Sequence, residues 1–288
     1  MRPATKTYAL TAAAMLAFAA NSMLCRQALA ATDIEATTFT AIRLAAGAAT
    51  LAALTTIRRR APAGTLASAL ALFGYAAAFS FAYRTLPAGT GALLLFGAVQ
   101  VTMVGCALVR GERLRGTAAA GFALAVAGVA TLLLPGASAP PLGGALLMLL
   151  AGASWGAYSL RGAGTRDAIA ATAGNFMLAT PMALALLALQ AVASTPVLAH
   201  SDPWQLDPLG AIYAALSGAV ASGLGYAVWY TALRGLTRTA AATSQLSVPV
   251  LTALGGIALL DEPVSLRLVV AAVAILGGIV MVIGARRG

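Results

Sequence analysis

The residues with the clearest capacity for chemistry are one arginine, several aromatic rings and two amides, all inside apolar runs. Arg43 stands in the run FTAIRL (39–44), about two turns into a long apolar segment. A charge buried in such a segment is costly unless it is paired or hydrated. Two roles stay open for Arg43: contact with a substrate carboxylate or a gate, or bonding to nearby carbonyls and headgroups.

Aromatic residues recur at helical spacing in three apolar segments. Tyr75, Phe79 and Tyr83 are four positions apart and therefore share one helix face. Trp229 stands 150 residues after Phe79, and Trp155 lies in a third segment. Converging rings suit a flat, amphipathic ligand, although single rings also serve at lipid interfaces. We predict that Phe79, Tyr83, Trp155 and Trp229 line a cavity.

Two amides interrupt apolar segments. Asn21 stands beside Ser22, and Gln245 stands four positions before Pro249. Polar groups in lipid need partners, so these side chains face other helices or a water-filled cavity. Pro249 lacks a backbone N–H, and a kink beside Gln245 would turn carbonyls towards a cavity. We predict that Asn21 and Gln245 donate and accept hydrogen bonds there, with helix packing as the alternative.

Several other chemistries lack their residues in this sequence. Lys6 is the only lysine and precedes the first apolar run, so a Walker A lysine is not available. His200, the only histidine, falls in a polar loop, where we expect it to be solvated. All eight acidic residues lie at segment ends or in loops, which disfavours cationic substrates and carboxylate-based proton coupling. We predict no enzyme activity, no cofactor and no metal site.

Composition indicates a membrane protein. Of the 288 residues, 60% are hydrophobic and 9% are charged, whereas a soluble domain carries roughly 25% charged residues. The net charge of +10 is spread singly or in short clusters between apolar runs, as loop charges of membrane proteins are. We therefore expect lipid around the chain and no nucleic-acid partner.

Ten apolar runs are long enough to span a bilayer, which takes about 20 residues. They lie near 7–30, 36–57, 65–84, 87–110, 114–135, 141–162, 167–193, 209–234, 238–260 and 264–286. We expect the first run to be retained as a span and not cleaved as a signal peptide.

Basic residues assign the two sides of the membrane. One side holds Arg2, Lys6, Arg58, Arg59, Arg60, Arg110, Arg113, Arg115, Arg161, Arg166, Arg234, Arg238, Arg286 and Arg287, out of eighteen Lys and Arg in all. By the positive-inside rule that side is cytoplasmic. We predict a multi-pass protein of the inner (cytoplasmic) membrane with both termini in the cytoplasm.

The second half of the sequence repeats the first. A shift of 150 residues places 82–128 on 232–278, and a shift of 135 aligns the first span with the sixth. Matched positions include Leu86 with Leu236, Glu112 with Glu262, Gly128 with Gly278, and Arg26 with Arg161. Each half holds an odd number of spans, so the halves are inverted. The sequence predicts an all-α membrane protein of two inverted five-helix repeats, 1–136 and 137–288.

Motifs in the second half carry a resemblance to a known family. They are the turn Ser247-Val248-Pro249, the Leu-rich stretch ending in Glu262-Pro263, and Gly277-Gly278. This half resembles the second repeat of an EamA-type transporter of the drug/metabolite transporter superfamily, and GERL (111–114) marks a looser first copy. Arg43 matches an arginine common in the family's second helix. The resemblance implies ten helices, two inverted five-helix repeats and a central cavity.

The family includes exporters of amino acids and other metabolites, and the aromatic residues favour aromatic amino acids within it. We predict a secondary transporter that exports small neutral or zwitterionic metabolites, with amino acids favoured, by alternating access. A nucleotide-sugar or sugar-phosphate carrier is the alternative, as is a non-transporting scaffold or intramembrane enzyme. Gly152 and Gly156 form a GxxxG pair that suits packing within the chain or a weak homodimer, so we expect a monomer or such a dimer.

Overall fold

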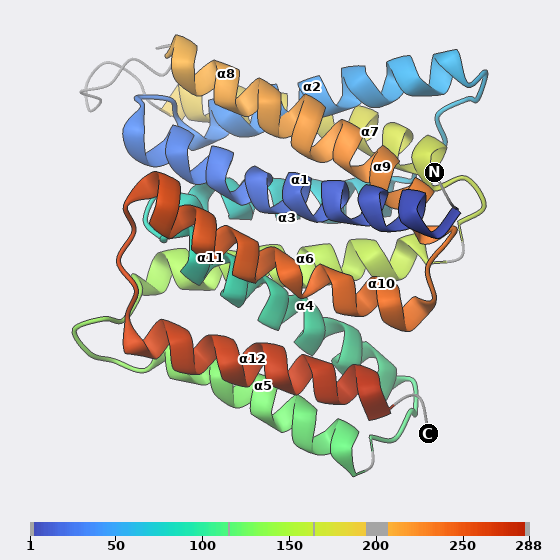
Figure 1. Cartoon of the computed structure of the whole chain (residues 1–288). Coiled ribbons are helices and arrows are strands. Elements are labelled where there is room, and N and C mark those ends of the chain that lie inside the picture. The colour runs from blue at the N-terminus through green and yellow to red at the C-terminus, as the bar shows by residue number, and fades with distance from the viewer. Residues whose placement is uncertain (1–2, 115, 164, 194–206, 286–288) are drawn as a thin grey trace.

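The computed structural model describes residues 3–114, 116–163, 165–193 and 207–285, and across these ranges the chain is helical without a strand (Figure 1). The helices are α1 (Pro3–Ala31), α2 (Ala36–Ile57), α3 (Leu66–Tyr83), α4 (Ala88–Val109), α5 (Thr117–Leu133), α6 (Leu142–Gly162), α7 (Ala168–Ala193), α8 (Pro208–Leu216), the π-helix η1 (Ser217–Leu224), α9 (Gly225–Leu233), α10 (Arg238–Gln245), α11 (Ser247–Leu260) and α12 (Leu266–Ala285). His200 lies outside the described residues.

These elements form the expected ten spans. Within the described ranges, nine are long and apolar enough to cross a bilayer, and α5 is shorter at 17 residues. The eighth span is continuous but passes through η1, and the ninth is divided at Leu246 into α10 and α11. Pro249 falls in the first turn of α11, where a missing backbone N–H costs little. The predicted kink beside Gln245 is therefore a break between two helices.

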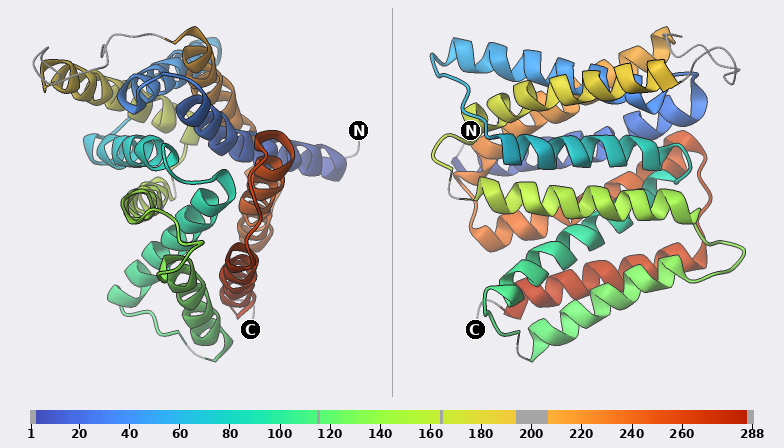
Figure 2. Two further views of the ribbon diagram at one scale, coloured as in Figure 1. Left: turned by 90° about the vertical axis from the view of Figure 1, so that its left-hand side faces the viewer. Right: turned by 180° about the vertical axis from the view of Figure 1, so that it is seen from behind.

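Both described chain ends lie at the same end of the bundle, together with the connections that follow α2, α4, α6 and α9 (Figures 1 and 2). This is the end where the sequence concentrates its arginines, among them Arg58, Arg59 and Arg60 after α2. The opposite end carries Asp33, Glu35 and other acidic residues. The two ends of the molecule therefore differ in charge as the sequence predicts.

Small residues let the helices approach closely, which is how helices associate where lipid is the solvent. α5 and α12 lie side by side at one edge of the bundle in all views (Figures 1 and 2). Gly121 of α5 and Gly278 of α12 face each other's backbone carbonyls there. Gly152 and Gly156 of α6 face α4 of the same chain, so this GxxxG pair serves packing within the chain.

At the edge of the bundle opposite α5 and α12, α2 packs against α7 and η1 (Figures 1 and 2). Gly218 of η1 faces the backbone of Arg43 so closely that a side chain there would collide with the Arg43 carbonyl. Gly47, one turn further along α2, faces the ring of Phe176 in α7. These contacts fix the rotation of α2 and direct Arg43 into the interior, where its side chain is 2% exposed.

Candidate binding cavity

A cavity of about 650 Å³ lies inside the bundle and opens at the arginine-rich end. Its lining comprises Phe18, Asn21, Ser22, Ala63, Thr65, Ser68, Tyr75, Phe79, Leu95, Phe96, Trp155, Tyr158, Ser159, Arg161, Gly162, Ala163, Thr165, Ala168, Ala171, Thr172, Asn175, Ala221, Ser222, Tyr226, Trp229, Tyr230, Leu233, Gln245 and Val248. Exposed residues of the connections after α2 and α6, such as Ala63 and Ala163, form its mouth. We call the other end of the bundle, beyond Asn21 and Phe79, the closed end.

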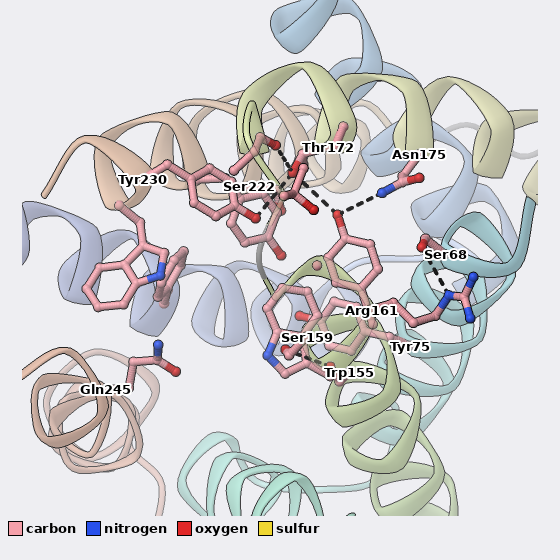
Figure 3. Close-up of a pocket in the computed structure, with 18 of the residues that line it drawn as sticks. Ser68, Tyr75, Trp155, Ser159, Arg161, Thr172, Asn175, Ser222, Tyr230 and Gln245 are labelled. Atoms are coloured by element: carbon pink, nitrogen blue, oxygen red, sulfur yellow. Dashed lines mark hydrogen bonds between the residues drawn. The ribbon is translucent and has the colours of Figure 1, made fainter. Parts of the chain in front are cut away.

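Aromatic rings form the middle of the cavity, with Trp155 of α6 at their centre (Figure 3). The Trp155 ring stacks on Tyr226, with 5.6 Å between centroids and 17° between planes, and on Tyr158 at 5.3 Å and 30°. It also contacts Tyr75 of α3 at 4.9 Å. On the α1 side, the ring of Phe18 meets Trp229 edge to face at 6.2 Å. Aromatic surfaces of this kind bind flat apolar groups while leaving polar tips available.

A first hydrogen-bond network joins α1, α2, α3 and η1 at the inner end of the cavity. Arg43 Nη2 donates to the Tyr75 hydroxyl at 3.1 Å, and Asn21 Nδ2 donates to the same hydroxyl at 3.4 Å. Ser217 Oγ donates to Asn21 Oδ1 at 2.7 Å. All four residues are buried, so the network fixes the direction of the Asn21 amide and the Tyr75 phenol.

A second network lies nearer the mouth and joins α6, α7 and α9 (Figure 3). Asn175 Nδ2 and the Tyr158 hydroxyl are 3.4 Å apart, and that hydroxyl donates to Thr172 Oγ1 at 3.4 Å. The hydroxyls of Thr172 and Tyr230 are 3.2 Å apart. Asn175 Oδ1 also accepts from the backbone N–H of Thr65 at 3.0 Å. The network therefore ties the connection after α2 to the wall of the cavity.

The charged side chains at and behind the cavity wall are positive. None of the described lining residues is acidic, and Arg161 at the mouth is the one cation among them. Behind the lining, the Arg43 guanidinium lies 5.1 Å from the Tyr75 ring centroid and 4.9 Å from that of Phe79. Arg43 Nη1 has no hydrogen-bond partner among the described residues. Two rings thus stabilise a buried cation, which acts on the cavity through the Tyr75 hydroxyl.

Charged side chains join three segments at the closed end. Arg26 Nε donates to Glu262 Oε1 at 3.1 Å, and Arg26 Nη1 donates to the carbonyls of Tyr83 at 3.1 Å and Arg84 at 3.4 Å. The two Glu262 carboxylate oxygens accept from the Ala88 backbone N–H at 3.0 and 2.7 Å. We call this set the closed-end latch.

Local backbone geometry places Glu262 in the closed-end latch. Asp261 has a left-handed conformation with φ of 52°, which ends α11, and the Glu262 N–H bonds to the Gly256 carbonyl at 3.0 Å. A side chain on Gly256 would meet Glu262 Oε2 at 2.7 Å, so glycine leaves room for the carboxylate. The carboxylate then caps the N-terminus of α4, where backbone N–H groups and the helix dipole favour an anion.

The structure brings five of the seven predicted site residues to the cavity wall: Asn21, Phe79, Trp155, Trp229 and Gln245. Arg43 lies behind Tyr75 and Phe79 and does not line the wall itself. Tyr83 lies further towards the closed end, where it is fully buried and its hydroxyl donates to the Ala88 carbonyl at 3.2 Å.

Sequence reasoning left several wall residues out of the predicted set, chiefly Phe18, Tyr158, Thr172, Asn175 and Ser222. Tyr158 and Asn175 carry the same signal as Trp155 and Asn21, an aromatic or amide group within an apolar span. Thr172 and Ser222 carry a weak signal, because hydroxyls inside helices commonly bond their own helix backbone. Their place in the wall depends on the rotation of α7 and η1.

Comparison with known proteins agrees with this architecture. The sequence model of the "EamA-like transporter family" matches residues 142–284. A Pseudomonas aeruginosa protein, "Uncharacterized protein PA1977", is 57% identical over 289 residues, which covers 99% of this chain and 97% of that one. A solved crystal structure with 22% sequence identity has a TM-score of 0.62 and covers 99% of this chain and 98% of that chain, which shows a shared fold.

The fold and the family match define a multi-pass helical membrane protein of the drug/metabolite transporter type. The chain belongs to the EamA-like transporter family, as the sequence resemblance indicated.

Proposed function

We propose that the protein is a secondary transporter that exports small neutral or zwitterionic metabolites, with amino acids as the favoured substrates. The observation that carries the proposal is the composition of the cavity wall. Stacked rings, three amides (Asn21, Asn175 and Gln245) and the buried cation of Arg43 surround a space of about 650 Å³, and none of its described lining residues is acidic. Ligand sites of this size are usually apolar with a few placed polar groups.

The wall offers a distinct partner to each part of an amino acid. The rings around Trp155 suit an apolar or aromatic side chain. The carboxylate suits the inner end, where the Tyr75 hydroxyl lines the wall, accepts from Arg43 and Asn21 behind it, and can donate its own proton to the substrate. The ammonium group suits amide oxygens and ring faces, such as those of Gln245 and Trp229. Aromatic amino acids fit this division best.

A nucleotide-sugar or sugar-phosphate substrate fits less well. Phosphate groups are usually held by several arginine or lysine side chains, often in bidentate pairs. The wall offers Arg161 at the mouth, and Arg43 is screened by Tyr75 and Phe79. Such substrates are therefore the second candidate class, and the transport test described below includes them.

We further propose that residues 1–136 and 137–288 are inverted repeats that rock about this cavity. The positions of helix ends support the proposal. α3 ends at Tyr83, and α9 ends 150 residues later at Leu233. α4 begins at Ala88, and α10 begins 150 residues later at Arg238. The helix pairs α2 with α7 and α5 with α12, one from each half, lie against each other. Repeats of this kind give secondary transporters a site that opens to alternate sides.

We propose that the arginine-rich end is cytoplasmic, by the positive-inside rule, and that the membrane is the inner membrane. The cavity then opens to the cytoplasm in this structure, as an exporter requires for loading its substrate. In that orientation the closed-end latch faces the periplasm.

The test is counterflow in proteoliposomes loaded with an unlabelled compound, with and without a pH gradient. Labelled neutral and aromatic amino acids, a nucleotide sugar and a sugar phosphate form the panel. We expect an amino acid to accumulate faster than in empty vesicles. Accumulation of the phosphate compounds alone would establish the second candidate, and no accumulation of any compound would contradict transport of both classes.

A matched pair of α6 variants links transport to the cavity. Trp155→Ala removes the central ring, whereas Leu150→Ala alters a side chain on the exposed surface of the same helix. We expect Trp155→Ala to lower the transport rate about tenfold or more, since stacking and burial of one ring contribute about 1–3 kcal/mol. Leu150→Ala should transport as the unaltered protein does.

A further inference from the structure

The closed-end latch joins the two halves of the chain at one end of the bundle. Arg26 belongs to the first half and Glu262 to the second, and their side chains are 21% and 12% exposed. A charge-assisted pair that also satisfies a helix N-terminus and helix C-terminal carbonyls holds these segments together. The latch is therefore one reason why the cavity is shut at this end.

Every part of the closed-end latch has a counterpart at the mouth under the repeat shifts. The counterparts are Arg161 for Arg26, Glu112 for Glu262, Arg238 for Ala88, and Leu233 with Arg234 for Tyr83 with Arg84. The counterparts of the two carbonyls lie at the end of α9, and the counterpart of the capped N–H opens α10. The same chemistry is therefore present at both ends of the cavity.

Backbone geometry repeats as well as sequence. Glu262 follows a residue with positive φ, Asp261 at 52°, and Glu112 follows Gly111 at 89°. The Glu262 N–H bonds back to Gly256 at 3.0 Å, and the Glu112 N–H bonds back to Ala107 at 3.0 Å. Both turns therefore place a residue of positive φ before the glutamate and return its N–H to the preceding helix, with a backbone bond that spans six residues at Glu262 and five at Glu112. This likeness is independent of the side-chain positions.

At the mouth, the arginine occupies a different position from that in the closed-end latch. Arg161 is exposed, and its Nε donates to Ser68 Oγ of α3 at 3.2 Å (Figure 3). Both Arg161 and Leu233 line the cavity. The arginine and the end of α9 therefore border the open entrance.

We infer that Arg161 and Glu112 form a second latch, the mouth latch, when the cavity opens at its other end. Arg161 then leaves Ser68 and donates to the Glu112 carboxylate and to the carbonyls of Leu233 and Arg234. Glu112 accepts from the first N–H of α10. The two latches close opposite ends and exclude each other. The inference rests on the alternating access proposed above, and it identifies the two sets of residues whose hydrogen bonds form in turn.

Loss of either glutamate should shift the conformational balance, and the two shifts have opposite signs. Glu262→Gln weakens closure of the closed end and favours opening there. Glu112→Gln weakens the alternative state and favours the cavity as it is seen in this structure. Each change should alter the balance about tenfold, as expected for one charge-assisted hydrogen bond.

Two cysteine reporters measure the balance in nanodiscs, where maleimide reaches both faces. Cys25 is fully buried one turn beyond Asn21 and Ser22 towards the closed end, and it becomes the sole thiol in a Cys106→Ala background. The second reporter is Ser159→Cys in the cavity wall, in a background that lacks both native cysteines. The closed-end reporter should react only while that end is open.

We expect Glu262→Gln to raise the labelling rate of Cys25 about tenfold and to slow that of Ser159→Cys. Glu112→Gln should lower the labelling rate of Cys25 by a similar factor, and the double variant should return towards the unaltered protein. Misfolding cannot produce the decrease in Cys25 labelling, since it exposes thiols.

The controls remove a carboxylate at each end that is not a member of either latch; Arg84 contributes its backbone carbonyl to the closed-end latch and its side chain to the Glu35 pair. Glu35→Gln acts on a pair with Arg84 at 3.7 Å at the closed end, and Asp167→Asn acts on a pair with Arg60 at 4.0 Å near the mouth. Neither should change labelling more than twofold. The mouth latch is refuted if Glu112→Gln leaves Cys25 labelling unchanged or raises it.

The labelling assay needs no substrate, so it separates this inference from the proposed function. Amino-acid transport without the opposite shifts would keep the function and overturn the mouth latch. The opposite shifts without transport of any test compound would keep the latch and overturn the proposed substrates.

Discussion

The two halves of the molecule agree at their helix ends and differ along the cavity. α4 runs unbroken from Ala88 to Val109, whereas the span 150 residues later is divided at Leu246. α3 is a plain α-helix, whereas the corresponding span contains η1. The glutamate turns at the two ends, in contrast, share a residue of positive φ before the glutamate and a bond from the glutamate N–H back to its helix. We propose that the shared ends serve the movement and the irregular middles serve the ligand.

The cavity wall shows the same division residue by residue. Phe79 and Trp229 are repeat partners, and both line the wall. Gln245, however, corresponds to Leu95, which also lines the wall but offers no polar group. Arg43 corresponds to Leu178, which is 41% exposed on the outer surface. At each of these two pairs of positions, only one half of the molecule therefore supplies a polar side chain.

The largest expected effect comes from removing the buried cation. Arg43→Met should lower transport about 100-fold, because a hydrogen bond to a charged group contributes about 1.5–3 kcal/mol. The fold should persist, since apolar replacement of a buried charge is often neutral or stabilising. Counterflow rate and thermal unfolding measure the two outcomes, with Leu178→Ala as the control on the other half. Retained transport in Arg43→Met would remove the arginine from the site.

The next effect tests the symmetric scaffold through two adjacent glycines of α12. Gly278→Ala places a side chain against the Gly121 carbonyl and the Ala125 N–H of α5, whereas at Gly277 it meets no described atom within 4 Å. We expect Gly278→Ala to destabilise the protein by about 2 kcal/mol, as overpacking does. Gly277→Ala should leave the unfolding temperature unchanged or raise it slightly. Equal unfolding temperatures would show that α5 and α12 do not need this close approach.

A smaller effect comes from making the ninth span resemble the fourth. Gln245→Leu copies the side chain of its partner Leu95 and removes an amide from the wall. We expect a rise in KM of about tenfold for a zwitterionic substrate, from the loss of one hydrogen bond. Leu95→Ile alters the partner position without changing polarity and should keep KM within about twofold. An unchanged KM in Gln245→Leu would assign the amide to helix packing.

The smallest effect concerns an exposed ion pair near the mouth. Arg60 Nε lies 4.0 Å from Asp167 Oδ2, and the two side chains are 70% and 46% exposed. Such pairs contribute at most about 1 kcal/mol, so Arg60→Gln should barely change the unfolding temperature or transport. Arg26→Gln, which breaks the more buried closed-end latch, is the comparison and should have the larger effect on both.

The sequence was sufficient for the spans because their signal is long and local. The run 36–57 coincides with α2, and 141–162 differs by one residue from α6. The run 209–234 was found as one span, but its π-helical middle was not foreseen. η1 depends on the close approach of Gly218 to the Arg43 backbone, which is a contact between distant segments.

Site residues were foreseen where one unusual group interrupts an apolar span, as with Asn21, Trp155 and Gln245. The arrangement among them was not, because it depends on how helices are rotated. The position of Trp155 between Tyr226 and Tyr75 joins three spans that lie far apart in the sequence. The sequence shows Arg26 and Glu262 only as positions that match Arg161 and Glu112 in the other repeat. Their pairing in the closed-end latch could not be predicted, because it requires the ends of α1 and α11 to meet.

The central claim is that the cavity recognises a zwitterion through its carboxylate, and competition in counterflow tests it most directly. Proteoliposomes accumulate labelled phenylalanine against unlabelled phenylalanine or against phenethylamine, the same molecule without its carboxylate. We predict that the amine competes at least tenfold more weakly, the difference expected for one charge-assisted hydrogen bond. Equal competition by the amine would contradict the account.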